Sequence, residues 1–226
     1  MDRDTVEPSV DEIPGERARE WVDYHHESAA PSTYVYGFVW DHTAPAVGPF
    51  CTDVDGNVLM DFAGHVAAAP LGYNNPTLGA RMAGFDLPDP ATLASENVFP
   101  AERSRLSSTW GGGDVVAALQ GALTLDVIEE EDLLDNATAR GESFRERVRD
   151  ADLDGVVDVR GKGLLIGVEC DTKERRDDVM AAAMELGLLL LGCGHKTLRI
   201  LPPLDVTERE VELAADLLAE AVAATA

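Results

Sequence analysis

The hydrophobic pattern is clearest in the last third of the chain. Short apolar runs over Val156–Val159 and Leu164–Glu169 predict two strands, and the Gly161-Lys162-Gly163 segment between them is typical of a turn. Helical spacing follows over Arg175–Leu186, and Gly187 stands where a helix commonly ends. These elements predict a β-hairpin followed by a helix.

A second group of two strands and a helix follows. Leu188–Leu191 and Thr197–Leu201 predict the strands, separated by a turn at Gly192-Cys193-Gly194. Thr207 and Glu210 have the spacing of a capping box. The helix after it has an apolar stripe of Val211, Ala215, Leu218 and Val222. The order β-β-α-β-β-α, with helices on one face of a small, mostly antiparallel sheet, predicts an α+β fold and not a doubly wound sheet.

The N-terminal half is less regular. An Asp55-Gly56-Asn57 turn between two β-rich runs predicts a hairpin, and a short helix is predicted over Pro14–His26. Residues 84–109 have no periodicity and contain three prolines, which predicts a connecting loop. Asp114 then opens a helical pattern, and Leu133–Val148 is either a second helix or a bent continuation of the first.

Length and composition indicate an ordinary globular protein. The chain has 226 residues, 45% of them hydrophobic, which is enough for one domain with a real core. Its apolar runs are far shorter than a bilayer span and its N-terminus is acidic, so we expect no membrane segment and no signal peptide. Its 3 cysteines have no CxxC spacing, so we expect neither disulfides nor a zinc site, and a reducing, cytoplasmic location.

The charge is strongly acidic. The formal net charge is −24, and the chain contains 15 Arg but only 3 Lys. This balance disfavours nucleic acid as a partner. It is typical of a halophilic, salt-adapted protein, in which an acidic surface says nothing about the substrate; a dedicated cationic partner is the alternative.

Two blocks of sequence carry recognisable motifs. Residues 50–80 include the run Asp61-Phe62-Ala63-Gly64 and then Leu71-Gly72-Tyr73-Asn74-Asn75-Pro76. Residues 97–205 include Ser108-Thr109-Trp110-Gly111-Gly112, Val159-Arg160-Gly161-Lys162-Gly163 and Leu198-Arg199-Ile200-Leu201-Pro202. In kind and order, both blocks resemble the class III aminotransferases, which depend on pyridoxal 5'-phosphate (PLP). The Ser-Thr-Trp-Gly-Gly segment and Cys193-Gly194 favour the lysine 6-aminotransferase branch.

The resemblance implies a definite domain organisation. The chain resembles the small domain, built from N- and C-terminal segments, of a fold-type-I PLP transferase. In the family a large α/β domain with the main PLP site lies between the two blocks, whereas a short loop joins them here. We therefore divide the chain into an acidic arm (1–33), an N-terminal aminotransferase segment (34–85), a connecting loop where the large domain would be (86–108) and a C-terminal small domain (109–226).

The family's Schiff-base lysine has no counterpart in the chain. In family members this Lys precedes the Ser-Thr-Trp segment by a few tens of residues, but here no Lys occurs before position 162. Lys162, Lys173 and Lys196 lie in predicted turns, and none matches the family's position. We therefore assign no catalytic residue and no metal, and we expect that PLP, the family's cofactor, is not bound by this chain alone.

Two family positions survive as candidate binding residues. Thr109 matches the Thr that contacts the cofactor phosphate of the neighbouring subunit in a dimer; the alternative is a residue of a helix-entry loop. Arg199 matches the Arg that binds the α-carboxylate of the amino acid; the alternative is an edge-strand charge on a salt-adapted surface. Cys193 and His195 are potential metal ligands without a third partner in the sequence.

Three functional hypotheses remain open. By resemblance, intact relatives transfer the terminal amino group of lysine, or of another ω-amino compound, to 2-oxoglutarate, and we expect this truncated chain to be inactive alone. The second hypothesis is a non-catalytic small-domain remnant that forms a homodimer, associates with a full-length paralogue or binds the carboxylate of an amino acid or 2-oxo acid. The third is a decayed gene product. None of them involves nucleic acid or a membrane.

Overall fold

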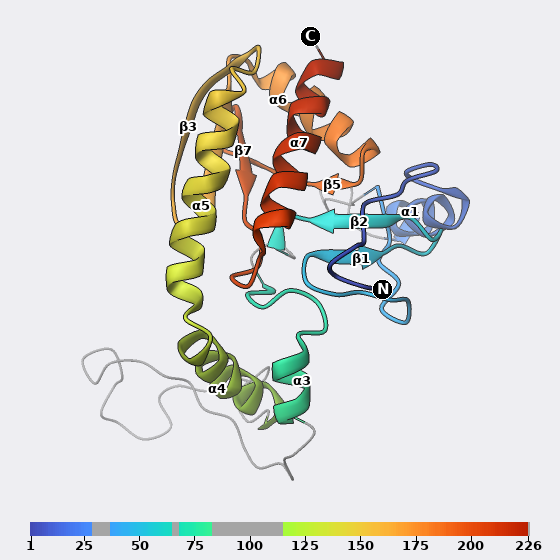
Figure 1. Cartoon of the computed structure of the whole chain (residues 1–226). Coiled ribbons are helices and arrows are strands. Elements are labelled where there is room, and N and C mark those ends of the chain that lie inside the picture. Colours follow the sequence, from blue (N-terminus) through green and yellow to red (C-terminus); the bar gives the residue numbers. More distant parts are fainter. Residues whose placement is uncertain (29–36, 65–67, 83–114, 226) are drawn as a thin grey trace, which may run out of the picture. The chain divides into compact units, whose positions relative to one another are not determined.

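A computed structural model describes residues 1–28, 37–64, 68–82 and 115–225 and has a mixed α and β architecture (Figure 1). The chain divides into two compact units. The first unit combines Met1–Asn74 with Leu134–Ala226, and the second unit is Asn75–Leu133. Segments from both ends of the sequence therefore build the first unit, which contains both sheets.

The smaller sheet of the first unit begins with the predicted hairpin. Strands β1 (Phe50–Thr52) and β2 (Val58–Asp61) pair antiparallel, with Thr52 opposite Val58. The Asp53 carboxylate closes the turn between them, because its Oδ1 accepts a hydrogen bond from the backbone N–H of Asn57 at 2.8 Å. The third strand, β5 (Leu188–Leu189), comes from the far end of the sequence and pairs parallel to β2.

The larger sheet has four antiparallel strands in the order β3-β4-β7-β6. Their bounds are Val156–Lys162 for β3, Leu165–Cys170 for β4, Leu191–Cys193 for β6 and Thr197–Ile200 for β7. The α+β fold class predicted from the sequence is confirmed, and so is the hairpin of β3 and β4.

One predicted strand is divided between the two sheets. The apolar run Leu188–Leu191 forms β5 of the smaller sheet and then β6 of the larger sheet. Leu188, Leu189 and Leu190 are all buried, because the chain passes through the core from one sheet to the other. A run buried on every side has no alternation, so its sequence pattern could not indicate the change of sheet.

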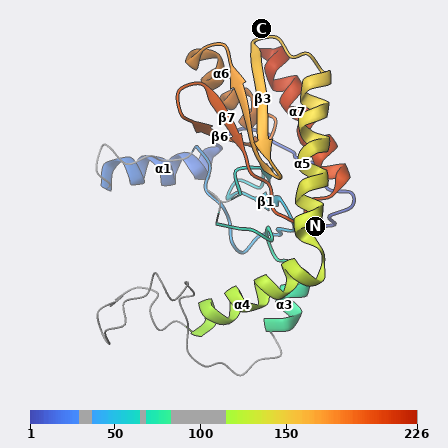
Figure 2. The same ribbon diagram turned by 90° about the vertical axis from the view of Figure 1, so that its left-hand side faces the viewer.

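Helices cover one face of the larger sheet. They are α5 (Leu133–Asp150), α6 (Lys173–Glu185) and α7 (Glu208–Ala224). Figures 1 and 2 show α5 and α7 lying along the same side of the strands, and α6 packs against α7 and against β4, β6 and β7. The predicted capping box of Thr207 and Glu210 is present at the start of α7. The predicted apolar stripe of α7 is buried along its whole length.

The remaining helices are α1 (Glu16–Ser28), α3 (Pro76–Met82) and α4 (Val115–Glu130). Between α4 and α5, Asp132 has a positive φ of 52°, so α5 is a separate helix and not a continuation of α4. Helix α3 was not predicted; the local signal was Asn75, whose side chain accepts from the backbone N–H of Leu78 at 3.0 Å, followed by Pro76. Over the described ranges, no helix combines the length and the apolar character that a bilayer span requires.

The core lies between the covered face of the larger sheet and its helices. Its large, fully buried side chains come from both halves of the sequence and include Phe50, Phe62, Phe144, Ile166, Leu198 and Leu218. The rings of Phe62 and Phe144 pack with centroids 6.3 Å apart. The hairpin of β1 and β2 is therefore continuous with the core of the C-terminal sheet.

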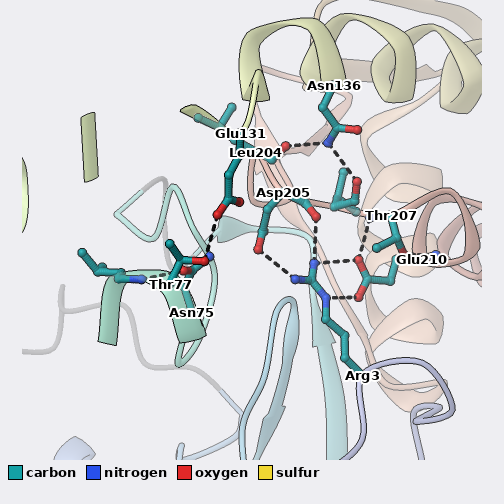
Figure 3. Close-up of polar contacts among 11 residues, drawn as sticks. Arg3, Asn75, Thr77, Glu131, Asn136, Leu204, Asp205, Thr207 and Glu210 are labelled. Carbon is teal, nitrogen blue, oxygen red and sulfur yellow. Dashed lines mark hydrogen bonds and ion pairs between the residues drawn. The ribbon is translucent and has the colours of Figure 1, made fainter. Parts of the chain in front are cut away.

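Arg3 connects the N-terminus to the start of α7 (Figure 3). Its Nε donates to Glu210 Oε1 at 2.7 Å, and its Nη1 donates to Asp205 Oδ2 at 2.8 Å. Burial lowers the pKa of Arg3, but the hydrogen bonds to Glu210 and Asp205 outweigh burial and leave the pKa above its ordinary value. The Glu210 side chain is fully buried and also accepts from the backbone N–H of Thr207 at 2.8 Å.

We predict that Arg3→Ala destabilises the fold by about 3 kcal/mol, because removing one partner leaves the Glu210 carboxylate buried and unpaired. Denaturant unfolding followed by circular dichroism measures the change. The control is Arg19→Ala, which breaks the exposed ion pair with Glu12 and should leave the midpoint unchanged. Equal midpoints for the two variants would show that the Arg3 contacts contribute nothing to stability.

Candidate functional site

Arg199 lies on the face of the larger sheet that the helices leave uncovered. It is in β7, opposite Gly167 of β4 on one side and Leu191 of β6 on the other. Its neighbours along β7, Leu198 and Ile200, are fully buried on the helix-covered face, so alternation directs Arg199 to the other face. The guanidinium therefore lies on a sheet surface flanked by a glycine and a leucine.

Arg160 is the neighbouring cation on this face, and two carboxylates of the protein neutralise its charge. It lies opposite Gly167 on β3, and its Nη1 donates to Asp158 at 2.7 Å and to Glu169 at 2.6 Å. The Arg160 guanidinium, together with Lys196, holds the pKa of Glu169 below its ordinary value. The Arg160 guanidinium is thus occupied by ion pairs with carboxylates of the protein.

Arg199 has no such partner. Of the Lys and Arg residues within the described ranges, only Arg17, Lys162 and Arg199 make no ion pair. The Nε atom of Arg199 is buried and has no hydrogen-bond partner. A buried, unsatisfied guanidinium N–H is costly, so this group is suited to an acceptor supplied from outside the described residues.

The three lysines of the chain lie at different places in the fold. Lys173, at the start of α6, pairs with Asp177, and Lys196 pairs with Glu169 at 3.3 Å. Lys162 is exposed at the end of β3.

The other candidates occupy different places. Thr109 lies outside the described residues. Cys193 and His195 lie at the exposed end of β6 and in the turn after it. In the part of the chain that the structure describes, no group of three His, Cys, Asp or Glu side chains could hold a metal ion.

A buried polar cluster in the smaller sheet could not be recognised from the sequence. The Tyr73 hydroxyl donates to Asp61 Oδ2 at 2.7 Å and lies in hydrogen-bonding contact with the Cys51 thiol. Burial raises the pKa of Cys51 to about 12, and the Asp61 carboxylate adds to this shift. Burial also raises the pKa of Tyr73. The thiol and the phenol therefore stay protonated, and the cluster serves to join β1, β2 and the segment after them.

Comparison with known proteins identifies the family. The sequence profile described as aminotransferase class-III matches residues 79–222, which is well over half of the chain. The chain belongs to the class-III aminotransferase family. The match contains Arg199 and all three lysines, so these residues can be considered in the context of a PLP-dependent family.

The chain is similar to only part of each relative in this family. It is 39% identical over 122 residues to an acetylornithine aminotransferase of Synechocystis sp., covering 52% of this chain and 28% of that protein. It is 40% identical over 134 residues to an L-lysine-epsilon aminotransferase of Amycolatopsis lactamdurans, covering 56% of this chain and 29% of that protein. The chain thus spans about a third or less of the length of these class-III relatives.

Solved structures agree with this assignment. A lysine aminotransferase from M. tuberculosis superposes with a TM-score of 0.51 at 31% identity, over 55% of this chain and 29% of that chain. An acetylornithine aminotransferase from Elizabethkingia anophelis superposes with a TM-score of 0.75 over 92% of this chain and 99% of that chain. At 14% identity, the second likeness concerns the fold alone.

The buried thiol gives a test of the smaller sheet. The folded pKa of Cys51 is about 12 and its ordinary value is 9.0, so the unfolded chain loses this proton first as the pH rises. The contribution of the Cys51 thiol to the free energy of unfolding should be fully present below pH 9.0. Above pH 9.0 it should fall by about 1.4 kcal/mol per pH unit, up to about pH 12.

Urea unfolding at pH 9.0 and at pH 10.0 measures this loss in the free energy of unfolding. Both pH values lie at or below 10.0, the ordinary pKa of tyrosine, which limits the contribution of Tyr73. Cys51→Ala should reduce the difference, whereas Cys193→Ala removes an exposed thiol and should leave it unchanged. A loss of the same size in all three proteins would exclude Cys51 as its source.

Proposed function

We propose that this chain is a carboxylate-binding small domain of a class-III aminotransferase and that it does not carry out transamination alone. The observation that carries the proposal is the unpaired Arg199 guanidinium on the uncovered face of the larger sheet. In a chain with a net charge of −24, a cation without a carboxylate partner is an exception. Its ligand is the carboxylate of an amino acid or of a 2-oxo acid.

The surroundings of Arg199 support this binding role. The planar guanidinium can donate two parallel hydrogen bonds to a carboxylate. Gly167, between Arg160 and Arg199, has no side chain to block such an approach, and Arg160 is already paired with Asp158 and Glu169. Arg199 is therefore the group on this row of the sheet that can accept an external anion.

The lysines support the proposed lack of transamination. All three are surface residues, two of them in ion pairs, and the chain has no lysine before position 162. The limited coverage of the relatives fits a chain in which the large cofactor domain is missing between residues 86 and 108. On this proposal, PLP has no defined binding position in the isolated chain.

We predict that 2-oxoglutarate and lysine perturb the amide resonances around Arg199 in an NMR titration, and that Arg199→Gln weakens the binding about tenfold because a charge-assisted contact is lost. Arg199→Lys should be intermediate, since an ammonium cannot form the bidentate contact. The control is Arg17→Gln, which removes another unpaired, exposed arginine. Unchanged affinity in Arg199→Gln would refute the carboxylate site.

We predict that incubation with PLP followed by borohydride reduction gives no stoichiometric adduct at any single lysine. Mass mapping of the reduced chain distinguishes Lys162, Lys173 and Lys196. Scattered, substoichiometric labelling fits three surface amines, whereas complete labelling of one of them would contradict the lack of a cofactor site. This outcome is independent of the Arg199 titration.

A further inference from the structure

A cavity of about 590 Å³ lies within the first unit, and Arg199 is not among its lining residues. Its walls come from the segment after β2, the first turns of α5, the turn between β3 and β4, and the segment after β7. All lining residues except Thr138 and Lys162 are apolar: Gly64, Ala69, Pro70, Leu134, Ala137, Gly163, Leu164, Leu165, Leu201, Pro202 and Leu204. The volume is within the range of about 300–1,000 Å³ that is usual for small-molecule sites.

Close backbone contacts hold these walls in place. A Cβ atom at Gly141 of α5 would overlap the carbonyl of Gly163, so the helix and the turn between β3 and β4 approach as closely as a glycine permits. Arg145 Nη1 donates to the same Gly163 carbonyl at 2.9 Å. Backbone contacts between α5 and this turn therefore fix one side of the cavity.

Lys162 is the single charged residue among the lining residues. The other polar group, Thr138 Oγ1, already donates to the Leu134 carbonyl at 3.0 Å. Unlike Lys173 and Lys196, Lys162 has no ion pair within the described ranges. Its ammonium is thus a positive group beside an apolar cavity. The chain has 42 acidic residues, but none of those described forms an ion pair with Lys162.

Two leucines of the cavity are unusually exposed. Leu134 is 67% exposed and Leu165 is 56% exposed, and both contribute to the lining. Exposed apolar side chains grouped at one concave site, beside a cation, indicate an amphipathic ligand. The apolar part would cover the leucines, and its charged end would neutralise the ammonium.

We propose that this cavity binds a small amphipathic carboxylate, with the aliphatic chain between α5 and the turn of β3 and β4 and the carboxylate at Lys162. The charge of Lys162 selects an anion over a cation of the same length. The eleven apolar residues around it select an aliphatic chain over a short polar acid. The site uses neither Arg199 nor PLP and is independent of the function proposed above.

Octanoate is the probe, with hexanoate and octanol as comparison ligands, in a calorimetric titration of the full chain. Octanoate should bind saturably at one site. Affinity should rise about fourfold per added methylene, which is the gain expected for burying each one, so hexanoate, with two methylenes fewer, should bind about fifteenfold more weakly. Octanol, which lacks the charge, should bind about fivefold more weakly.

Matched variants locate the site. Lys162→Gln should reduce octanoate affinity to that of octanol, whereas Lys173→Gln, which alters a lysine on α6, should have no effect. Leu134→Gln should weaken both ligands, and Leu125→Gln, which changes an exposed leucine of α4, should weaken neither. All four positions are exposed, so circular dichroism should show an unchanged fold.

Three results would overturn the proposal. The first is no saturable octanoate binding. The second is equal octanoate affinity in Lys162→Gln and in the unmodified chain. The third is self-association that Leu134→Gln abolishes and octanoate does not reverse, because the leucines would then be covered by a second copy of the chain.

Discussion

The buried Glu210 carboxylate is the constraint on which the first unit depends. It caps α7 by accepting from Thr207, and it forms an ion pair with Arg3, which is 207 positions away in the sequence. A fully buried carboxylate is tolerated only when its oxygens are satisfied, so helix α7 and the N-terminal residues must come together. In the same unit, the pairing of β2 with β5 and the packing of Phe62 against Phe144 join the N-terminal hairpin to the C-terminal segment.

Because the chain is rich in acidic side chains, few of its described cations remain without an ion-pair partner. Nearly every described Lys and Arg has a carboxylate within ion-pair distance, as Arg160 does with Asp158 and Glu169. Against this background, Arg199 and Lys162 are exceptions, and each lies where an external anion could approach. One is on an uncovered sheet face, and the other is beside an apolar cavity. The two sites differ in surroundings and therefore in the anion that each would select.

The chain belongs to the class-III family but covers less than a third of the length of the relatives described above. The matched region contains the four-stranded sheet and its helices, whose core also takes in Phe50, Met60 and Phe62 of the N-terminal hairpin. Of the three lysines in the same region, Lys173 and Lys196 pair with carboxylates, and Lys162 is exposed. On the function proposed above, the chain keeps the family fold and a carboxylate-binding arginine without the family's reaction.

Local spacing in the amino-acid sequence was enough to predict the Asp55-Gly56-Asn57 turn, the capping box at Thr207, the apolar stripe of α7 and the resemblance to the family. These features depend on neighbours a few residues apart, so spacing alone reveals them. Four features became visible only in the folded chain: the division of Leu188–Leu191 between two sheets, the partner of Arg3, the unpaired state of Arg199 and the cavity beside Lys162. Each of these features arises between segments that are far apart in the chain. The local spacing of residues does not indicate which distant segment will provide a partner, or whether any will.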